Sequence, residues 1–172
     1  MNRTPFDTLI TRIATEYRLP PELIEAVVLQ ESGGDPFAWN PEPRYRWLWN
    51  VRTNKPFRSL TSAEQVSEVP PADFPTLAGD RDQEFWAQQA SWGLMQIMGA
   101  LGRELGCRWP YLTKLLQVEL NLQYGCAHLG GLLRWANGKH DLALAAYNGG
   151  KGNPQFGYAK EVLARVQGDL RA

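Results

Sequence analysis

The chain has 172 residues, of which 44% are hydrophobic, which is enough for one sizeable core and too little for two ordinary domains. We therefore expect a single domain over residues 1–172. Lys and Arg together number 18, as do Asp and Glu, so the formal net charge is zero. This balance excludes a broad electrostatic attraction to nucleic acid or acidic membranes. A charged polymer would have to be recognised locally.

The N-terminal segment, the cysteines and the histidines further limit the class of protein to which the chain can belong. Residues 1–22 mix charged and apolar side chains without a continuous apolar stretch, which is typical of neither a secretory signal nor a membrane span. Cys107 and Cys126 are too few for a disulfide scaffold, so we expect reduced, structural thiols. His128 and His140 have no partner at metal-ligand spacing. We expect no stable membrane insertion, no metal site and no cofactor.

The first elements are predicted to be two helices. Apolar residues recur at helical spacing over residues 5–18, and the prolines at 20 and 21 mark the start of a second helix. Gly33 and Gly34 favour chain reversal and end this helix just past Glu31.

An irregular insertion is predicted over about residues 37–89, because its many prolines make a long helix improbable. Within it, residues 45–52 alternate between apolar and polar side chains ahead of a turn at 53–55. This pattern predicts a small β-hairpin.

Helical patterns dominate the rest of the chain. They predict a helix around residues 82–105 and a long buried helix over 111–135. Asp141 is expected to cap a short helix that runs through Ala146, and residues 158–166 are helical again. The fold class is therefore mainly α.

Glu31 is the unusual residue of the second helix. Ile24, Val27, Val28 and Glu31 fall at i, i+3, i+4 and i+7, so the carboxyl shares the apolar face. Partial desolvation there would raise its pKa and keep a proton available, as general acid catalysis requires. On this pattern alone, a Glu that reaches solvent or caps a loop is the more common outcome.

Two later segments place polar side chains beside glycine, at residues 91–97 and 145–150. Glycine lets a bulky ligand approach the backbone, and Gln, Tyr and Asn supply hydrogen bonds that orient an uncharged sugar. Taken alone, Gly93 and Gly149 are more often turn residues, and we expect Met95 and Ile97 to be core residues.

Three motifs in order, Glu31-Ser32, the run at 93–97 and the run at 146–150, resemble those of the soluble lytic transglycosylase family. The resemblance covers about residues 20–50 and 88–166. It implies a lysozyme-like, goose-type fold that is mainly α and binds peptidoglycan strands of alternating N-acetylglucosamine and N-acetylmuramic acid. In that family one Glu, matched by Glu31, protonates the glycosidic oxygen and then helps the muramoyl 6-hydroxyl close an anhydro ring.

The same resemblance implies a substrate-binding set. Gln96, Tyr147 and Asn148 match positions that line the family's cleft, and Ser91 stands where the family often carries Ser or Ala. We expect these residues to position the substrate and to support the charge that builds at the anomeric carbon.

The insertion is longer and more aromatic than in the family's shortest forms. The resemblance therefore does not determine whether cleavage yields an anhydro or a reducing end. Glu42, between two prolines, is a candidate second carboxylate, in which case water would be the nucleophile and the enzyme a hydrolytic muramidase. A solvated loop Glu is the plainer interpretation of Glu42, and Asp35 is a weaker candidate that more often would shape the turn.

Aromatic and basic side chains of the insertion are further candidates for glycan contacts. Indole rings stack on the apolar faces of sugars, and we expect at most two of these tryptophans to touch glycan: Trp39, Trp47, Trp49, Trp86 and Trp92. Arg44, Arg46 and Arg52 suit peptide-stem carboxylates, although a solvated face is the more common role.

The N-terminal pattern leads us to expect a monomeric phage or prophage endolysin. Such an enzyme is made in the host cytoplasm and reaches the peptidoglycan after holin-dependent release, or acts from the virion. A non-catalytic peptidoglycan-binding tail component is the alternative from another class. Glu31 argues against it, because a binding module has no need of a desolvated carboxyl that costs stability.

Overall fold

The computed structural model describes residues 4–169. It is mainly helical, as the sequence predicts, with two small antiparallel sheets, of which the sequence predicts only a hairpin. The chain divides into two compact units. The terminal unit consists of the residues before Pro36 and after Asn121, and the central unit of Pro36–Asn121. The expectation of a single domain over residues 1–172 stays a prediction.

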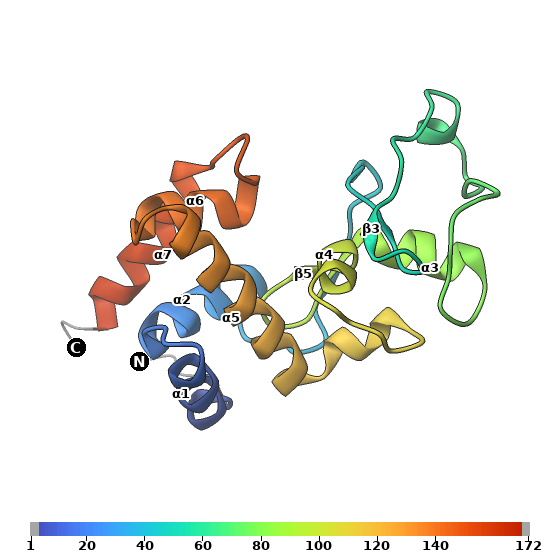
Figure 1. The fold of residues 1–172 in the computed structure, drawn as a ribbon. Coiled ribbons are helices and arrows are strands. Elements are labelled where there is room, and N and C mark those ends of the chain that lie inside the picture. Colours follow the sequence, from blue (N-terminus) through green and yellow to red (C-terminus); the bar gives the residue numbers. More distant parts are fainter. Residues whose placement is uncertain (1–3, 170–172) are drawn as a thin grey trace. The chain divides into compact units, whose positions relative to one another are not determined.

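The terminal unit is built from helices. These are α1 (Asp7–Glu16), α2 (Pro21–Ser32), most of α5 (Val118–Trp135), α6 (His140–Gly149) and α7 (Phe156–Asp169). Helix α7 packs against both α2 and α6, and α1 packs against α2 (Figure 1). The buried core is almost entirely aliphatic and includes Ile10, Ile13, Leu23, Ile24, Val27, Val28, Leu122, Leu129, Leu144, Ala145 and Val162.

Helix α2 forms where the sequence predicts it. Pro21 occupies the first helical position, where a missing N–H costs nothing. Val27 and Val28 are fully buried, and Gly33 closes the helix in the left-handed region at φ 64°. Glu31 therefore lies in the last turn of a helix that is anchored by its apolar side.

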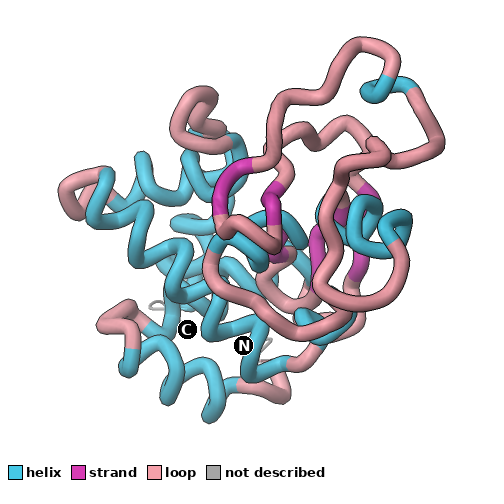
Figure 2. Tube along the Cα trace, turned by 45° about the vertical axis from the view of Figure 1, so that its right-hand side comes forward, coloured by secondary structure: helices cyan, strands magenta, loops and turns pink. Residues whose placement is uncertain are grey.

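The central unit contains all the strands of the described chain. Strands β1 (Trp39–Pro41), β4 (Ala90–Trp92) and β5 (Ile97–Met98) form one antiparallel sheet in that order, and β2 (Trp49–Asn50) pairs with β3 (Lys55–Pro56). The second pair is the predicted hairpin, shorter than expected. The remaining elements are α3 (Arg81–Gln88), α4 (Gly99–Glu104) and the 3-10 turns η1 (Glu64–Val66) and η2 (Leu112–Leu116). Loops connect these short elements (Figure 2).

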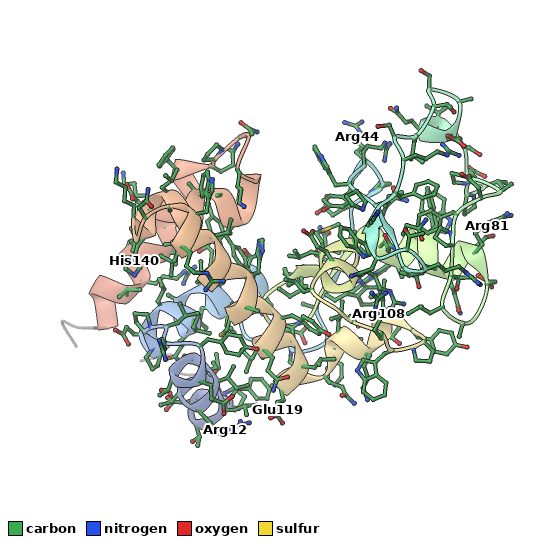
Figure 3. The ribbon with its side chains drawn as sticks, in the orientation of Figure 1. Arg12, Arg44, Arg81, Arg108, Glu119 and His140 are labelled. Carbon is green, nitrogen blue, oxygen red and sulfur yellow. The ribbon has the colours of Figure 1, made fainter. Side chains whose placement is uncertain are left out.

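Three sequence predictions about helices are wrong in part. The helix over 82–105 is interrupted by β4 and β5, because Gly93 and Gln96 both adopt positive φ and reverse the chain between them. The helix over 111–135 is broken at Gln117, which is extended. Asp141 does not cap α6: Lys139 is its N-cap residue, His140 begins the helix (Figure 3), and Asp141 lies in the first turn.

A buried ion pair joins the elements of the central unit. The guanidinium of Arg103 on α4 donates to both carboxylate oxygens of Glu84 on α3, at 2.8 and 2.6 Å, and both side chains are almost fully buried. Arg103 also donates to the carbonyl oxygens of Cys107 and Trp109. These bonds satisfy a buried charge that would otherwise be costly. Cys107 and Cys126 are both free and buried, as predicted.

The close contact of α4 with the end of α3 yields a stability prediction. A Cβ on Gly99 would lie 2.0 Å from the carbonyl oxygen of Ala87, so Gly99→Ala must displace backbone and should destabilise the protein by about 1–3 kcal/mol. The matched control is Gly157→Ala in α7, where a Cβ meets nothing within 4 Å and should stabilise by about 0.5–1 kcal/mol. Urea unfolding of both variants measures this, and equal effects would contradict the packing described.

Candidate functional site

The centre of the candidate site is the carboxyl of Glu31 in the terminal unit. Tyr158 on α7 donates from Oη to Oε1 of Glu31 at 2.5 Å. Burial raises the pKa of Glu31 from its ordinary value of 4.5 to about 7, and the hydrogen bond from Tyr158 opposes this only in part. A large fraction of Glu31 is therefore protonated near neutral pH and can deliver a proton.

Two tyrosine rings stack beside this carboxyl. The rings of Tyr147 on α6 and Tyr158 on α7 are nearly parallel, with an interplanar angle of 11° and centroids 6.4 Å apart. Burial and then the charge of Glu31 raise the pKa of both phenols above their ordinary value of 10. Both hydroxyls therefore stay protonated and keep their capacity to donate hydrogen bonds.

Two titratable groups near these tyrosines, His128 and Cys126, have pKa values shifted toward their neutral forms. The ring of His128 on α5 lies 5.2 Å from that of Tyr147, and burial lowers the pKa of His128 to about 4, with Lys151 acting in the same direction. Burial raises the pKa of the Cys126 thiol to about 12. His128 is thus a neutral ring that packs on Tyr147, in line with the structural role expected from the sequence.

Tyr158 is the residue that the sequence analysis missed. The sequence places it only at the start of a helical tail, whereas the structure pairs it directly with Glu31. The available signal was its position beside buried Ala159 and four residues before buried Val162, which puts a polar-tipped ring on the packed side of α7. Asn148, by contrast, is exposed on α6.

Ser91 and Gln96 bond to each other within the central unit. The hydroxyl of Ser91 donates to Oε1 of Gln96 at 2.8 Å. The amide nitrogen of Gln96 donates to the carbonyl oxygens of Gly93 and Ala38, at 2.9 and 3.3 Å. Gln96 therefore holds the reversal between β4 and β5 in place, and its amide oxygen keeps one lone pair for a ligand.

Asn121 also stabilises the chain reversal between β4 and β5. Its side-chain oxygen accepts from the backbone N–H of Met95 at 2.8 Å, and its nitrogen donates to the carbonyl oxygens of Trp92 and Leu115 at 2.7 and 2.8 Å. A Cβ on Gly93 would approach Asn121 to 2.6 Å. The glycine of the second motif is thus required both by its φ of 68° and by this contact. Met95, like Ile97, is buried, as predicted.

Glu42 is exposed in the central unit, directly after β1. Its carboxylate accepts a hydrogen bond of 2.6 Å from the side-chain nitrogen of Asn40, and its backbone N–H donates to the carbonyl oxygen of Gln89. The chain at Glu42 is thus tied to the end of α3. Asp35 is exposed, and its N–H donates to the carbonyl oxygen of Ser32 in the turn after α2.

The arginines of the insertion have different roles. Arg46 donates to the carbonyl oxygens of Pro43, Tyr45 and Gln65, so it ties loops of the central unit together. Arg44 and Arg52 are exposed, and Figure 3 labels Arg44 on its loop. Only these two stay candidates for contacts with an anionic ligand.

Residues 4–169 contain neither a cluster of metal-binding side chains nor a helix that could span a membrane. Within them, no group of three or more His, Cys, Asp or Glu side chains is arranged to hold a metal ion. No helix in this part of the chain is long and apolar enough to cross a bilayer.

The chain matches the profile of a known family, and its fold is similar to that of a solved structure. A family profile described as "Transglycosylase SLT domain" matches residues 8–162. The structure is similar to that of an inactive mutant of the lytic transglycosylase Slt from Pseudomonas aeruginosa, with a TM-score of 0.58 and 18% sequence identity. The match covers 98% of this chain and 25% of that chain, so this chain spans about a quarter of that protein's length. No curated protein sequence matches significantly.

The raised pKa of Glu31 predicts a pH-dependent cost in stability. The folded state holds this proton more tightly than the unfolded state, so the penalty is absent below pH 4.5, grows as pH rises, and is complete above about pH 7. Glu31→Gln removes it. The variant should match the parent near pH 4.5 and exceed its free energy of unfolding by about 1–2 kcal/mol at pH 8, allowing for solvent screening.

Urea unfolding at both pH values measures this difference. Glu161→Gln is the matched control, because Glu161 is exposed on α7 and its loss should give no such gain. A Glu31→Gln effect that is the same at pH 4.5 and pH 8 would contradict the raised pKa.

Proposed function

The chain belongs to the transglycosylase SLT domain family, and we propose that it is a peptidoglycan lytic transglycosylase with Glu31 as its acid and base. The substrate is the glycan strand, cut at the β-1,4 bond between N-acetylmuramic acid and N-acetylglucosamine. The observation that carries this proposal is the partly buried carboxyl of Glu31, which accepts a hydrogen bond from Tyr158 at 2.5 Å and has a pKa of about 7. A similar fold occurs in the lytic transglycosylase Slt, whose inactive mutant replaces a glutamate by glutamine.

Glu31 acts first as an acid and then as a base. The protonated carboxyl gives its proton to the glycosidic oxygen, and the bond from that oxygen to the muramoyl anomeric carbon breaks. The carboxylate then takes the proton of the muramoyl 6-hydroxyl as this oxygen bonds to the anomeric carbon. The products are a free 4-hydroxyl and a 1,6-anhydro ring, Glu31 is protonated again, and no water is consumed.

The tyrosines beside Glu31 support both halves of this cycle. The Tyr158 hydroxyl at 2.5 Å holds the carboxyl in one orientation and stabilises the carboxylate that forms after proton delivery. Tyr147 stays protonated, so its hydroxyl is suited to donate toward charge that develops on the substrate. We further propose that Ser91, Gln96 and Asn148 contact the sugar, Gln96 through the free lone pair of its amide oxygen.

Capture of water, with Glu42 as the second carboxylate, is the other candidate route. Its support is that Asn40 holds the Glu42 carboxylate at 2.6 Å. A non-catalytic binding role is disfavoured, because a buried carboxyl costs stability without serving adhesion. The expected role in phage-mediated lysis rests on residues 1–22 alone and stays a prediction, as do holin-dependent release and the monomeric state.

Replacing Glu31 tests the acid directly. Glu31→Gln keeps the size and a hydrogen-bond acceptor for Tyr158 but cannot deliver a proton, so the rate of peptidoglycan solubilisation should fall by at least about 100-fold. Turbidity loss of purified sacculi measures the rate, and co-sedimentation with sacculi should be retained. Glu161→Gln should lyse at the parent rate. Full lysis by Glu31→Gln would sink the assignment.

The chemistry of the cut ends separates the two routes. Mass spectrometry of the digested sacculi should find 1,6-anhydromuramic ends, and Glu42→Gln should leave both the rate and these ends unchanged. Glu68→Gln is the control for another exposed carboxylate of the central unit. Reducing ends, together with a large loss of rate in Glu42→Gln alone, would instead establish hydrolysis.

A further inference from the structure

The central unit contains a pocket of about 420 Å³ between β1, α3 and η2. This volume lies within the usual range for small-ligand sites, roughly 300–1,000 Å³. The side chains that give it its character are Trp39, Trp86, Trp92, Tyr111, Gln83 and Thr113.

The pocket lies on the opposite face of the sheet from Ser91. In the β1–β4 register Trp39 pairs with Trp92, and Asn40 pairs with Ser91. Paired residues share a face and successive residues alternate, so the tryptophans occupy one face and Ser91 the other. Since Ser91 bonds to Gln96, the pocket is separate from the motif residues assigned to the substrate above.

Three aromatic rings at this pocket are unusually accessible. The exposed fractions are 56% for Trp39, 38% for Trp86 and 51% for Tyr111, whereas Trp92 is 7% exposed and its ring centroid lies 6.1 Å from that of Trp39. Exposed rings gathered around one hollow offer flat apolar faces to a ligand that also has flat apolar faces.

Polar groups lie at the edges of these rings. Among the described residues, the indole N–H groups of Trp39 and Trp86 and the hydroxyl of Tyr111 make no hydrogen bond within the protein, whereas the N–H of Trp92 donates to Ala87. A purely apolar ligand would bury these donors unsatisfied, at a cost of about 1–3 kcal/mol each. The pocket therefore suits a ligand with hydroxyl or amide groups around its rim.

The pocket carries no free charge. Glu84 lines it, but both oxygens of that carboxylate are bound by Arg103. The nearby ammonium of Lys114 lies over the ring of Trp109, 4.3 Å from its centroid. An ionic ligand would thus lose its hydration without gaining a counter-charge.

We propose that this pocket is a second glycan-binding site, which takes an uncharged N-acetylhexosamine ring by stacking on Trp39, Trp86 and Tyr111. This binding role goes beyond the proposed function, because the site performs no chemistry. It holds the polymer on the face of the sheet opposite Ser91 and keeps the enzyme on its substrate between cuts.

The site is tested with the N-acetylglucosamine dimer, chitobiose, as the probe. The seven tryptophans give seven indole N–H signals in a nitrogen-15 NMR spectrum, which single substitutions assign. Chitobiose at about 10 mM, for a millimolar site, should shift the signals of Trp39 and Trp86 and leave Trp109 unmoved. Trp109 is the matched reference, since it is 49% exposed and does not line the pocket.

Substitutions at the pocket provide a second test of chitobiose binding. Trp39→Leu and Tyr111→Leu keep apolar volume but lose the flat ring, and each should weaken chitobiose binding by about fivefold or more. Trp109→Leu should bind as the parent does. Tyr111→Leu serves if Trp39→Leu fails to fold, because Tyr111 lies outside the sheet.

The outcome is independent of catalysis, because Glu31→Gln should give the same shifts as the parent. Loss of lysis in that variant and loss of chitobiose shifts are therefore separate failures. Unmoved signals of Trp39 and Trp86, equal shifts at Trp109, or a response of these signals to hexanol but not to chitobiose would overturn the proposal.

Discussion

The burial of one carboxyl against one phenol is the constraint on which the site depends. Glu31 lies at the end of α2, whose apolar side is fixed in the core of the terminal unit. Removal from water raises its pKa to about 7, and the 2.5 Å hydrogen bond from Tyr158 keeps the shift from going further. A deeper carboxyl would never ionise, and a solvated one would not hold a proton. The balance leaves Glu31 able to do both near neutral pH.

The rings beside this pair are uncharged and pack against one another. Tyr147 stacks on Tyr158, and His128 packs on Tyr147 as a neutral ring. No formal positive charge from His128 is therefore available to lower the pKa of Glu31. In the central unit, Gln96 and Asn121 stabilise the local backbone. Their hydrogen bonds to Gly93 and Met95 hold the chain reversal between β4 and β5.

The sequence predicted the parts of the fold that local patterns determine. The apolar stripe and the paired glycines gave α2 and placed Glu31 on its packed side. The prediction of a helix over 82–105 was wrong because the chain reversal at Gly93 depends on Asn121. The side chain of Asn121 accepts a hydrogen bond from Met95, 26 residues away in the sequence. Tyr158 was missed for the same reason: its pairing with Glu31 spans 127 residues and exists only once α7 packs on α2.

Titration of Glu31 by carbon-13 NMR of its side-chain carboxyl measures the pKa of this group in the folded protein. We expect a midpoint near pH 7, and a higher midpoint in Tyr158→Phe, because the hydrogen bond that favours the carboxylate is lost. A midpoint near the ordinary 4.5, unchanged in Tyr158→Phe, would contradict the central claim that burial keeps a proton on Glu31.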